Sequence, residues 1–138
     1  MADMNEFNIG IIKEFRANAG KCTGMFAGAP MILVTHTGAK SGRSYTSPLV
    51  YSSDGDRYVI IASKGGAPNH PDWYHNLVKN PVVTVEIGTE KFQVRAKTTS
   101  GAERERLFDA QAKMMPQFNQ YKAATKREIP VFVLERIK

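Results

Sequence analysis

The sequence lacks several features that would define its class at once. It has a single cysteine, Cys22, so no internal disulfide can form, and no second cysteine or histidine stands near it at zinc-ligand spacing. No apolar run approaches the about eighteen residues of a membrane-spanning helix. The start of the chain has neither the basic residues nor the apolar stretch of a secretory signal. We therefore expect a cytoplasmic protein without a metal, in which Cys22 has no chemical role.

Acidic residues are also in short supply. The chain has 13 Asp and Glu against 19 Lys and Arg, which gives a net charge of +6. Such an excess attracts nucleic acid, acidic membranes or acidic small molecules. The basic residues are scattered, however, and no helix-turn-helix, zinc-finger or aromatic RNA-binding motif is present. An acidic small molecule explains the charge more economically than nucleic acid does.

The length of the chain favours one folded unit. With 138 residues, of which 42% are apolar, it can bury one core and is too short for two full domains. Apolar residues recur at helical spacing within residues 1–20 and predict an amphipathic helix that Gly20 ends. Its short apolar stripe and mixed charges favour a cover for the core over a membrane-surface anchor. We expect a single domain, 1–138, with its main core over residues 31–138.

After residue 30 the pattern changes to short strands separated by turns. Helices are expected at 72–79 and from a capping box of Ser100 and Glu103 to about residue 114. Six strands at this spacing indicate an α+β protein built on a small antiparallel barrel or sandwich. Strands are predicted at 31–37, 45–52, 57–63, 82–87, 91–98 and 131–137, with hairpin turns at 53–56 and 87–89.

The loop between the first two predicted strands is a candidate ligand site. It carries Gly38, Gly42, Lys40 and Ser41, which supply the backbone amides, ammonium group and hydroxyl that a phosphate needs. On its own, such a turn is more typical of an ordinary exposed hairpin loop. A second loop of the same character, at residues 63–66, favours ligand binding.

Residues 62–77 carry the most informative pattern in the chain. Lys64 offers a positive charge, and the two glycines after it let the backbone approach a ligand closely. A helix start near Pro71 points unpaired amides at the same place, and the Trp-Tyr pair that follows adds flat aromatic surface. A ligand with an anionic end and a planar heterocycle suits this combination. The pattern therefore predicts a small oxidoreductase with a nucleotide-like redox cofactor.

Several motifs in fixed order also carry a family resemblance. From Leu33 to the C-terminus the chain resembles the deazaflavin-dependent nitroreductase family of actinobacteria. The resemblance implies a split β-barrel and a bound 8-hydroxy-5-deazaflavin, coenzyme F-420. It also implies hydride transfer to a quinone, a nitro-aromatic or the activated alkene of a coumarin-type lactone. The motifs are Thr-Gly-Ala-Lys-Ser-Gly at 37–42, Thr-Ser-Pro-Leu at 46–49, Asp-Gly-Asp-Arg-Tyr at 54–58, Ala-Ser-Lys-Gly-Gly at 62–66, His-Pro-Asp-Trp-Tyr-His-Asn-Leu at 70–77 and Asn-Pro at 80–81.

The same resemblance implies a set of cofactor-binding residues. Lys40 and Ser41 match positions that hold the phosphate and the acidic tail. Tyr45 stands where many members have an arginine, and Arg43 is the candidate replacement for that charge. The full set is Lys40, Ser41, Arg43, Ser47, Pro48, Leu49, Ala62, Ser63, Lys64, Gly65, Gly66, Pro71, Trp73, Tyr74 and Asn76.

The acceptor side of the site is implied by the helical stretch before the last strand. Met115, Phe118 and Tyr121 match family positions that line the open side of the deazaflavin, although core packing accounts equally well for the first two. Tyr121 is the candidate catalytic residue, as the phenol that orients a carbonyl or donates a proton, with solvent as the alternative donor. The three histidines have no evident carboxylate partner and are expected to be structural or solvent-facing.

Three other functions stay open at this point. A flavin-mononucleotide (FMN) oxidoreductase shares the barrel and a phosphate-bearing tricyclic ligand, although the motif set argues against it. A non-catalytic carrier of the deazaflavin or of a hydrophobic ligand would keep both basic loops. A nucleic-acid-binding barrel would bind in a salt-dependent way without a chromophore. The sequence also leaves open whether the protein is a monomer or a homodimer, and whether the first thirty residues cover the acceptor pocket.

Overall fold

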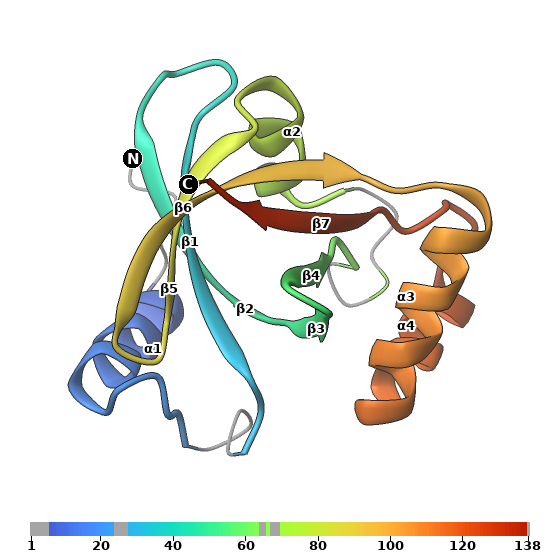
Figure 1. Ribbon diagram of the computed structural model, residues 1–138, viewed down its shortest axis with the longest axis horizontal. Helices are drawn as coiled ribbons and strands as arrows, with labels where there is room; N and C mark the ends of the chain where they lie inside the picture. Colours follow the sequence, from blue (N-terminus) through green and yellow to red (C-terminus); the bar gives the residue numbers. More distant parts are fainter. Residues whose placement is uncertain (1–5, 24–27, 64–65, 67–69, 138) are drawn as a thin grey trace.

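The computed structural model describes residues 6–23, 28–63, 66 and 70–137 (Figure 1). Neighbouring strands all pair antiparallel in one seven-stranded sheet, in the order β2-β1-β5-β6-β7-β4-β3. The helices are α1 (Glu6–Ala17), α2 (Asp72–Lys79), α3 (Gly101–Met114) and α4 (Gln117–Ala124). The strands are β1 (Met31–Thr37), β2 (Ser44–Val50), β3 (Ser52–Asp54), β4 (Arg57–Ile61), β5 (Val82–Ile87), β6 (Glu90–Thr98) and β7 (Val131–Arg136).

The sheet curls because its two edge strands are neighbours in the sequence. β2 ends at Val50 and β3 begins at Ser52, yet these strands lie at opposite ends of the strand order. Only Tyr51 separates them, so the sheet has to roll until its two edges meet. Figure 1 shows the resulting half-open barrel, in which β2 runs directly into β3. The predicted α+β split barrel is confirmed.

Alternate residues along β1 face two different environments. Ile32 and Val34 point into the barrel interior, where they join a cluster that includes Trp73 of α2. Met31 and Leu33 point outward and pack against α1. The alternation follows from the period of two in a strand. The N-terminal helix is therefore a cover for the outer face of β1 and β2.

The same alternation on the opposite side of the barrel creates a second covered face. Ile60 of β4 and Phe132 of β7 belong to the interior cluster. Val59 and Val133, next to them in the sequence, point outward to α3 and α4. Figure 1 shows these two helices packed together at one end of the molecule, far from α1. α2 packs elsewhere on the barrel, beside β1 and β6.

The predicted elements agree with the observed ones except at two places. The strand expected at 45–52 is two strands, because the chain bends at Tyr51 to change sheet edge. The capping box predicted for α3 is wrong. Ser100 occupies the N-cap position without a side-chain hydrogen bond in the described structure, and Glu103 instead binds Arg57 at 3.2 Å. The guanidinium of Arg57 attracts the carboxylate away from the helix start.

No helix within the described ranges is long and apolar enough to span a membrane. The predicted cytoplasmic location stays a prediction.

Candidate functional site

The loop between β1 and β2 is closed tightly by its own backbone. The Gly38 amide donates to the Arg43 carbonyl over 2.7 Å, and the Gly42 amide donates to the Gly38 carbonyl over 3.0 Å. A Cβ atom at Gly38 would lie 2.9 Å from Cε2 of Tyr45, so a larger residue would force the loop and the ring apart. The loop is therefore a compact turn that presents Lys40 to solvent.

This turn borders an open pocket of about 470 Å³ between the β1–β2 loop and α2. Lys40 is exposed at the pocket, where its ammonium group can meet an anion. Ser41 also lines the pocket, but its Oγ lies 2.9 Å from the Tyr45 hydroxyl, so Tyr45 stabilises the turn through Ser41. Arg43 is exposed and precedes β2, so strand alternation does not decide its direction. The lining residues are Gly38, Ala39, Lys40, Ser41, Tyr45, Asp72, His75 and Asn76.

A smaller cavity of about 90 Å³ adjoins this pocket on the inner face of β2. Both cavities have Tyr45, Asp72 and Asn76 in their walls, so they lie side by side, and together we call them the groove. Ser47 lines the smaller part and lies two residues along the strand from Tyr45, so both side chains point to the same face. The groove has the size of small-molecule sites, which span roughly 300–1,000 Å³.

A chain of neutral hydrogen bonds lies beneath the groove. The Ala39 amide donates to Oδ1 of Asn76 over 2.8 Å, and Nδ2 of Asn76 lies 3.0 Å from Nδ1 of His36. Nε2 of His36 lies 2.9 Å from Oγ of Ser47. His36 is 4% exposed and Asn76 is 7% exposed. Burial lowers the pKa of His36 to about 4, although the negative charge of Asp72 acts in the opposite direction. His36 is therefore structural, as predicted, but it lies directly behind the candidate site.

The second predicted loop follows β4, and Arg127 ties its two ends together. The guanidinium donates to the carbonyl oxygens of Ala62 over 3.2 Å and of Ser63 over 2.7 Å. It also lies 2.9 Å from Nδ1 of His70, on the far side of the loop. Lys64 and Gly65 lie outside the described residues, so their assignment to the cofactor stays a prediction.

Gly66 of this loop packs closely against α4. Its backbone has a φ of +83°, which favours glycine. A Cβ atom there would lie 2.8 Å from Cβ of Ala124 and 2.9 Å from the carbonyl oxygen of Tyr121. The loop predicted to bind the cofactor therefore contacts the helix predicted to line the acceptor site.

The start of α2 combines backbone amides that no described side chain caps with aromatic side chains. Pro71 occupies the N-cap position, and no side chain in the described ranges caps the helix there. Trp73 is buried against Phe132, with ring centroids 5.8 Å apart, and it also lines the smaller cavity. Tyr74 packs between Phe132 and His70, at centroid distances of 5.7 and 4.3 Å. Much of the aromatic surface expected to meet a ligand is thus part of the core.

The predicted cofactor residues of β2 lie on both faces of the strand. Leu49 packs on the interior cluster, on the same face as Ser47. Pro48 pairs with Leu33, whose side chain packs against α1 on the outer face. The Pro48 ring is therefore directed away from the groove, and only its backbone can contact a ligand there.

The three predicted acceptor residues lie together at α4 and the end of α3. Phe118 is 6% exposed and packs edge-on against Phe108 and Tyr121, with ring centroids 6.4 and 5.2 Å apart. Met115 and Tyr121 are half-buried at the border of the same cluster. Core packing therefore accounts for Phe118, whereas Tyr121 keeps part of its surface accessible.

Sequence reasoning assigned no role to three residues that shape the site: Asp72, Lys79 and Arg127. Asp72 lines both cavities, and Lys79 holds the β1–β2 loop by donating to the Ala39 carbonyl over 2.8 Å. Arg127, which binds the Ala62 and Ser63 carbonyls, also had no local signal. Asp72 and Lys79 stand at the two ends of a predicted helix next to a ligand motif, which is the one clue the sequence offered. Within the described residues, no group of three or more His, Cys, Asp or Glu side chains could hold a metal ion.

Comparisons with known proteins give the site a family. Residues 11–136 match the family described as F420H(2)-dependent quinone reductase. An F420H(2)-dependent quinone reductase of Mycobacterium tuberculosis is 40% identical over 126 residues, which cover 88% of this chain and 85% of that protein. A solved structure described as an F420-H2 dependent reductase (FDR-A) is 39% identical over 77% of this chain and 94% of its own, with a TM-score of 0.71. Another, described as a domain-swapped dimer, is 35% identical over 92% of this chain and 93% of its own, with a TM-score of 0.72.

A more distant structure shares the fold alone. HutZ, a heme storage protein of Vibrio cholerae, is 15% identical, with a TM-score of 0.64 over 92% of this chain and 88% of its own. The same barrel therefore serves proteins with different ligands, so the fold by itself does not identify the cofactor. The family match and the relatives above 30% identity do identify it. They show that this chain belongs to the F420H(2)-dependent quinone reductase family and is a reductase whose cofactor is coenzyme F-420.

Proposed function

We propose that this reductase passes a hydride from reduced F-420 to flat, apolar, electron-poor acceptors: quinones first, and also nitro-aromatics and coumarin-type lactones. When bound, F-420 supplies the hydride, and the protein binds and orients the two partners and excludes water. The contact between Gly66 and α4 carries the proposal. It joins the loop that would hold the cofactor to the helix that would line the acceptor site.

The groove between β2 and α2 has the chemistry that F-420 requires. Lys40 would bind the phosphate or the glutamate tail, and the uncapped amides at the start of α2 favour an anion at the same end of the molecule. Ser47 and the backbone of β2 would lie along the cofactor. The residues of this chain therefore fit the group.

The acceptor side is apolar and has one accessible phenol. Met115 and Tyr121 would contact the acceptor, and Phe118 would support them from the core. An apolar wall selects flat hydrophobic molecules because burial removes their surface from water. Tyr121 would orient a carbonyl or donate a proton, with solvent as the other donor.

The first test is a titration of the purified protein with oxidised F-420 and, in parallel, with FMN. Cofactor fluorescence reports binding, and absorbance reports reoxidation of reduced F-420 after a quinone, a nitro-aromatic or a coumarin is added. Deazaflavin-selective binding with reoxidation by all three acceptors supports the proposal. Reoxidation by the quinone alone restricts it to quinones. Binding without reoxidation by any of them would instead indicate a carrier.

Two variants separate the cofactor and acceptor parts of the site. Lys40→Ala should weaken F-420 binding at least about tenfold, the effect of losing a charge-assisted hydrogen bond. Lys113→Ala removes the same charge from the exposed last turn of α3 and should leave binding unchanged. Tyr121→Phe should lower turnover more than cofactor affinity. An equal loss of both would place Tyr121 in cofactor binding instead.

The similar structure described as a domain-swapped dimer supports a homodimer. Sedimentation equilibrium over a range of protein concentrations tests this assembly. A single monomeric species at micromolar concentration would contradict it.

A further inference from the structure

The chain of hydrogen bonds beneath the groove has only one self-consistent direction. The Ala39 amide is a donor, so it fixes the side-chain oxygen of Asn76 toward itself at 2.8 Å. The amide nitrogen of Asn76 then faces Nδ1 of His36 at 3.0 Å and must donate to it. A reversed Asn76 would place two donors against each other at Ala39. The orientation of the amide, which is normally ambiguous, is thus set by a backbone group.

The state of His36 follows from that orientation. Because Nδ1 accepts a hydrogen bond, a neutral ring carries its proton on Nε2. Nε2 lies 2.9 Å from Oγ of Ser47 and donates to it. A doubly protonated His36 would place an N–H against the Asn76 donor. Burial favours the neutral form, which is consistent with a pKa of about 4.

The hydroxyl proton of Ser47 takes no part in this chain of hydrogen bonds. The hydroxyl oxygen accepts the hydrogen bond from Nε2 of His36, and among the described residues no second hydrogen bond of this hydroxyl is found. Ser47 lines the smaller cavity of the groove. The Ser47 hydroxyl can therefore donate a hydrogen bond to a ligand that lies in this cavity.

We propose that Asn76 and His36 are positioning residues that hold Ser47 as an outward-facing hydrogen-bond donor. Ser47 would then select a ligand atom that accepts, such as a carbonyl or phosphate oxygen, and disfavour one that donates. The inference rests on the proposed function in so far as the ligand is F-420. The direction of the bonds is a property of the protein alone.

The first experiment measures that direction without a ligand. Long-range ¹H–¹⁵N correlation spectra of the histidine-labelled protein at pH 7 report which nitrogen of His36 carries a proton. We expect the proton on Nε2 alone, and the exposed ring of His75 gives a second histidine signal for comparison. A proton on Nδ1, or on both nitrogens, overturns the proposal.

The second experiment is a double-mutant cycle on binding of oxidised F-420. Ser47→Ala should weaken binding about tenfold, as expected for one neutral hydrogen bond. Ser47→Thr, which keeps a hydroxyl, should recover part of that loss. His36→Leu should weaken binding by a similar factor in the wild type and cause no further loss in Ser47→Ala, because it acts through Ser47. Independent, multiplied losses would show that His36 acts by another route and would overturn the proposal.

The two experiments distinguish a failure of the proposed function from a failure of the inference about Ser47. A wild type that does not bind F-420 contradicts the proposed function, and the spectrum of His36 still decides the direction of the Ser47 donor. If His36→Leu fails to fold, the spectrum and the two Ser47 variants carry the test alone.

Discussion

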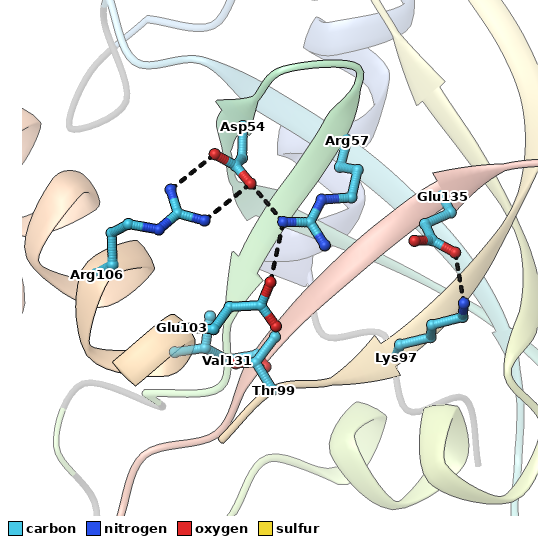
Figure 2. A network of polar contacts seen from close by, with 8 residues as sticks. All are labelled: Asp54, Arg57, Lys97, Thr99, Glu103, Arg106, Val131 and Glu135. Carbon is cyan, nitrogen blue, oxygen red and sulfur yellow. Dashed lines mark hydrogen bonds and ion pairs between the residues drawn. The ribbon is translucent and has the colours of Figure 1, made fainter. Parts of the chain in front are cut away.

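Two polar networks in this protein differ in charge, in burial and in what they connect. One lies on the surface, where Asp54 of β3 accepts hydrogen bonds from Arg57 and Arg106, and Arg57 also reaches Glu103 of α3 (Figure 2). The other runs through Asn76 beneath the ligand groove and is neutral and buried. The first attaches α3 to the β3–β4 hairpin, and the second shapes the candidate site.

The comparison shows that the charge of a polar network is a poor guide to its contribution to stability. Exposed ion pairs are worth about 0–1 kcal/mol because water and salt screen them. A buried donor or acceptor that loses its partner costs about 1–3 kcal/mol, since nothing replaces the lost bond. A single substitution in the charged network should therefore cost little stability. In the neutral network, the donor or acceptor role of each group is set by the group next to it, so one substitution affects the whole chain of hydrogen bonds.

Breaking the buried network at its centre should have the largest effect. Asn76→Leu removes the partner of both the Ala39 amide and His36, and we expect the free energy of unfolding to fall by about 3 kcal/mol. Urea denaturation measures it. Asn119→Leu, the same change at an exposed position of α4, is the matched control and should have little effect. Equal losses for the two variants would contradict the proposed difference.

Lowering the pH should weaken the buried network before the surface one. The pKa of His36 is lowered from 6.5 to about 4 by folding, so the unfolded chain binds more protons between these values. His36 therefore contributes its full share of stability above pH 6.5, and about 3 kcal/mol is lost as the pH falls to 4. The arginines around Asp54 hold the pKa of that carboxyl well below 3.8, so its contribution is lost only at more acidic pH. The difference in unfolding free energy between wild type and His36→Leu, followed from pH 7.5 to 4, should shrink in this window. A constant difference would contradict it.

Arg127 offers an intermediate case, a charged group that binds neutral acceptors in a half-buried position. Arg127→Met removes the donor to the Ala62 and Ser63 carbonyls, and we expect a loss of about 2 kcal/mol of stability together with weaker F-420 binding. Thermal unfolding and cofactor titration measure the two effects. A loss of stability without any loss of binding would show that Arg127 does not position the loop after β4 for cofactor binding.

The smallest effect should come from the surface network. Asp54→Asn removes the charge that Arg57 and Arg106 share, but all three groups are close to solvent. Stability should change by no more than the error of a denaturation experiment, and any change should vanish in high salt. A large, salt-independent loss would mean that this network is more than a surface attachment.

Much of the fold could be predicted from local patterns. Phe92, Val94 and Ala96 alternate with polar residues, a pattern typical of a strand with one exposed face, and Gly55 and Gly88 lie in the two predicted hairpin turns. The closure of the barrel could not be predicted from such patterns. It depends on which strand pairs with which, and no local signal at Tyr51 says that the chain changes sheet edge there.

The site was predictable as a set of motifs and not as a set of contacts. Lys40 and Ser47, two residues of the predicted cofactor set, line the two adjoining cavities, but Pro48 faces the other way because the strand alternates. The failed capping box has a similar cause. Glu103 has the right spacing for the motif, yet a residue 46 positions away offers a stronger partner. Long-range competition of this kind is invisible in a local sequence pattern.

The contact between Gly66 and α4 has a consequence for how acceptor preference can change. The atoms nearest to the position of a Cβ at Gly66 belong to the backbone of Tyr121 and to the short Ala124 side chain, and not to the Tyr121 phenol. The side chains proposed to line the acceptor site could therefore be exchanged while the contact between Gly66 and α4 is kept. If the proposed roles hold, substitutions at positions 115 and 121 would change the acceptor preference without moving the loop proposed to hold the hydride donor.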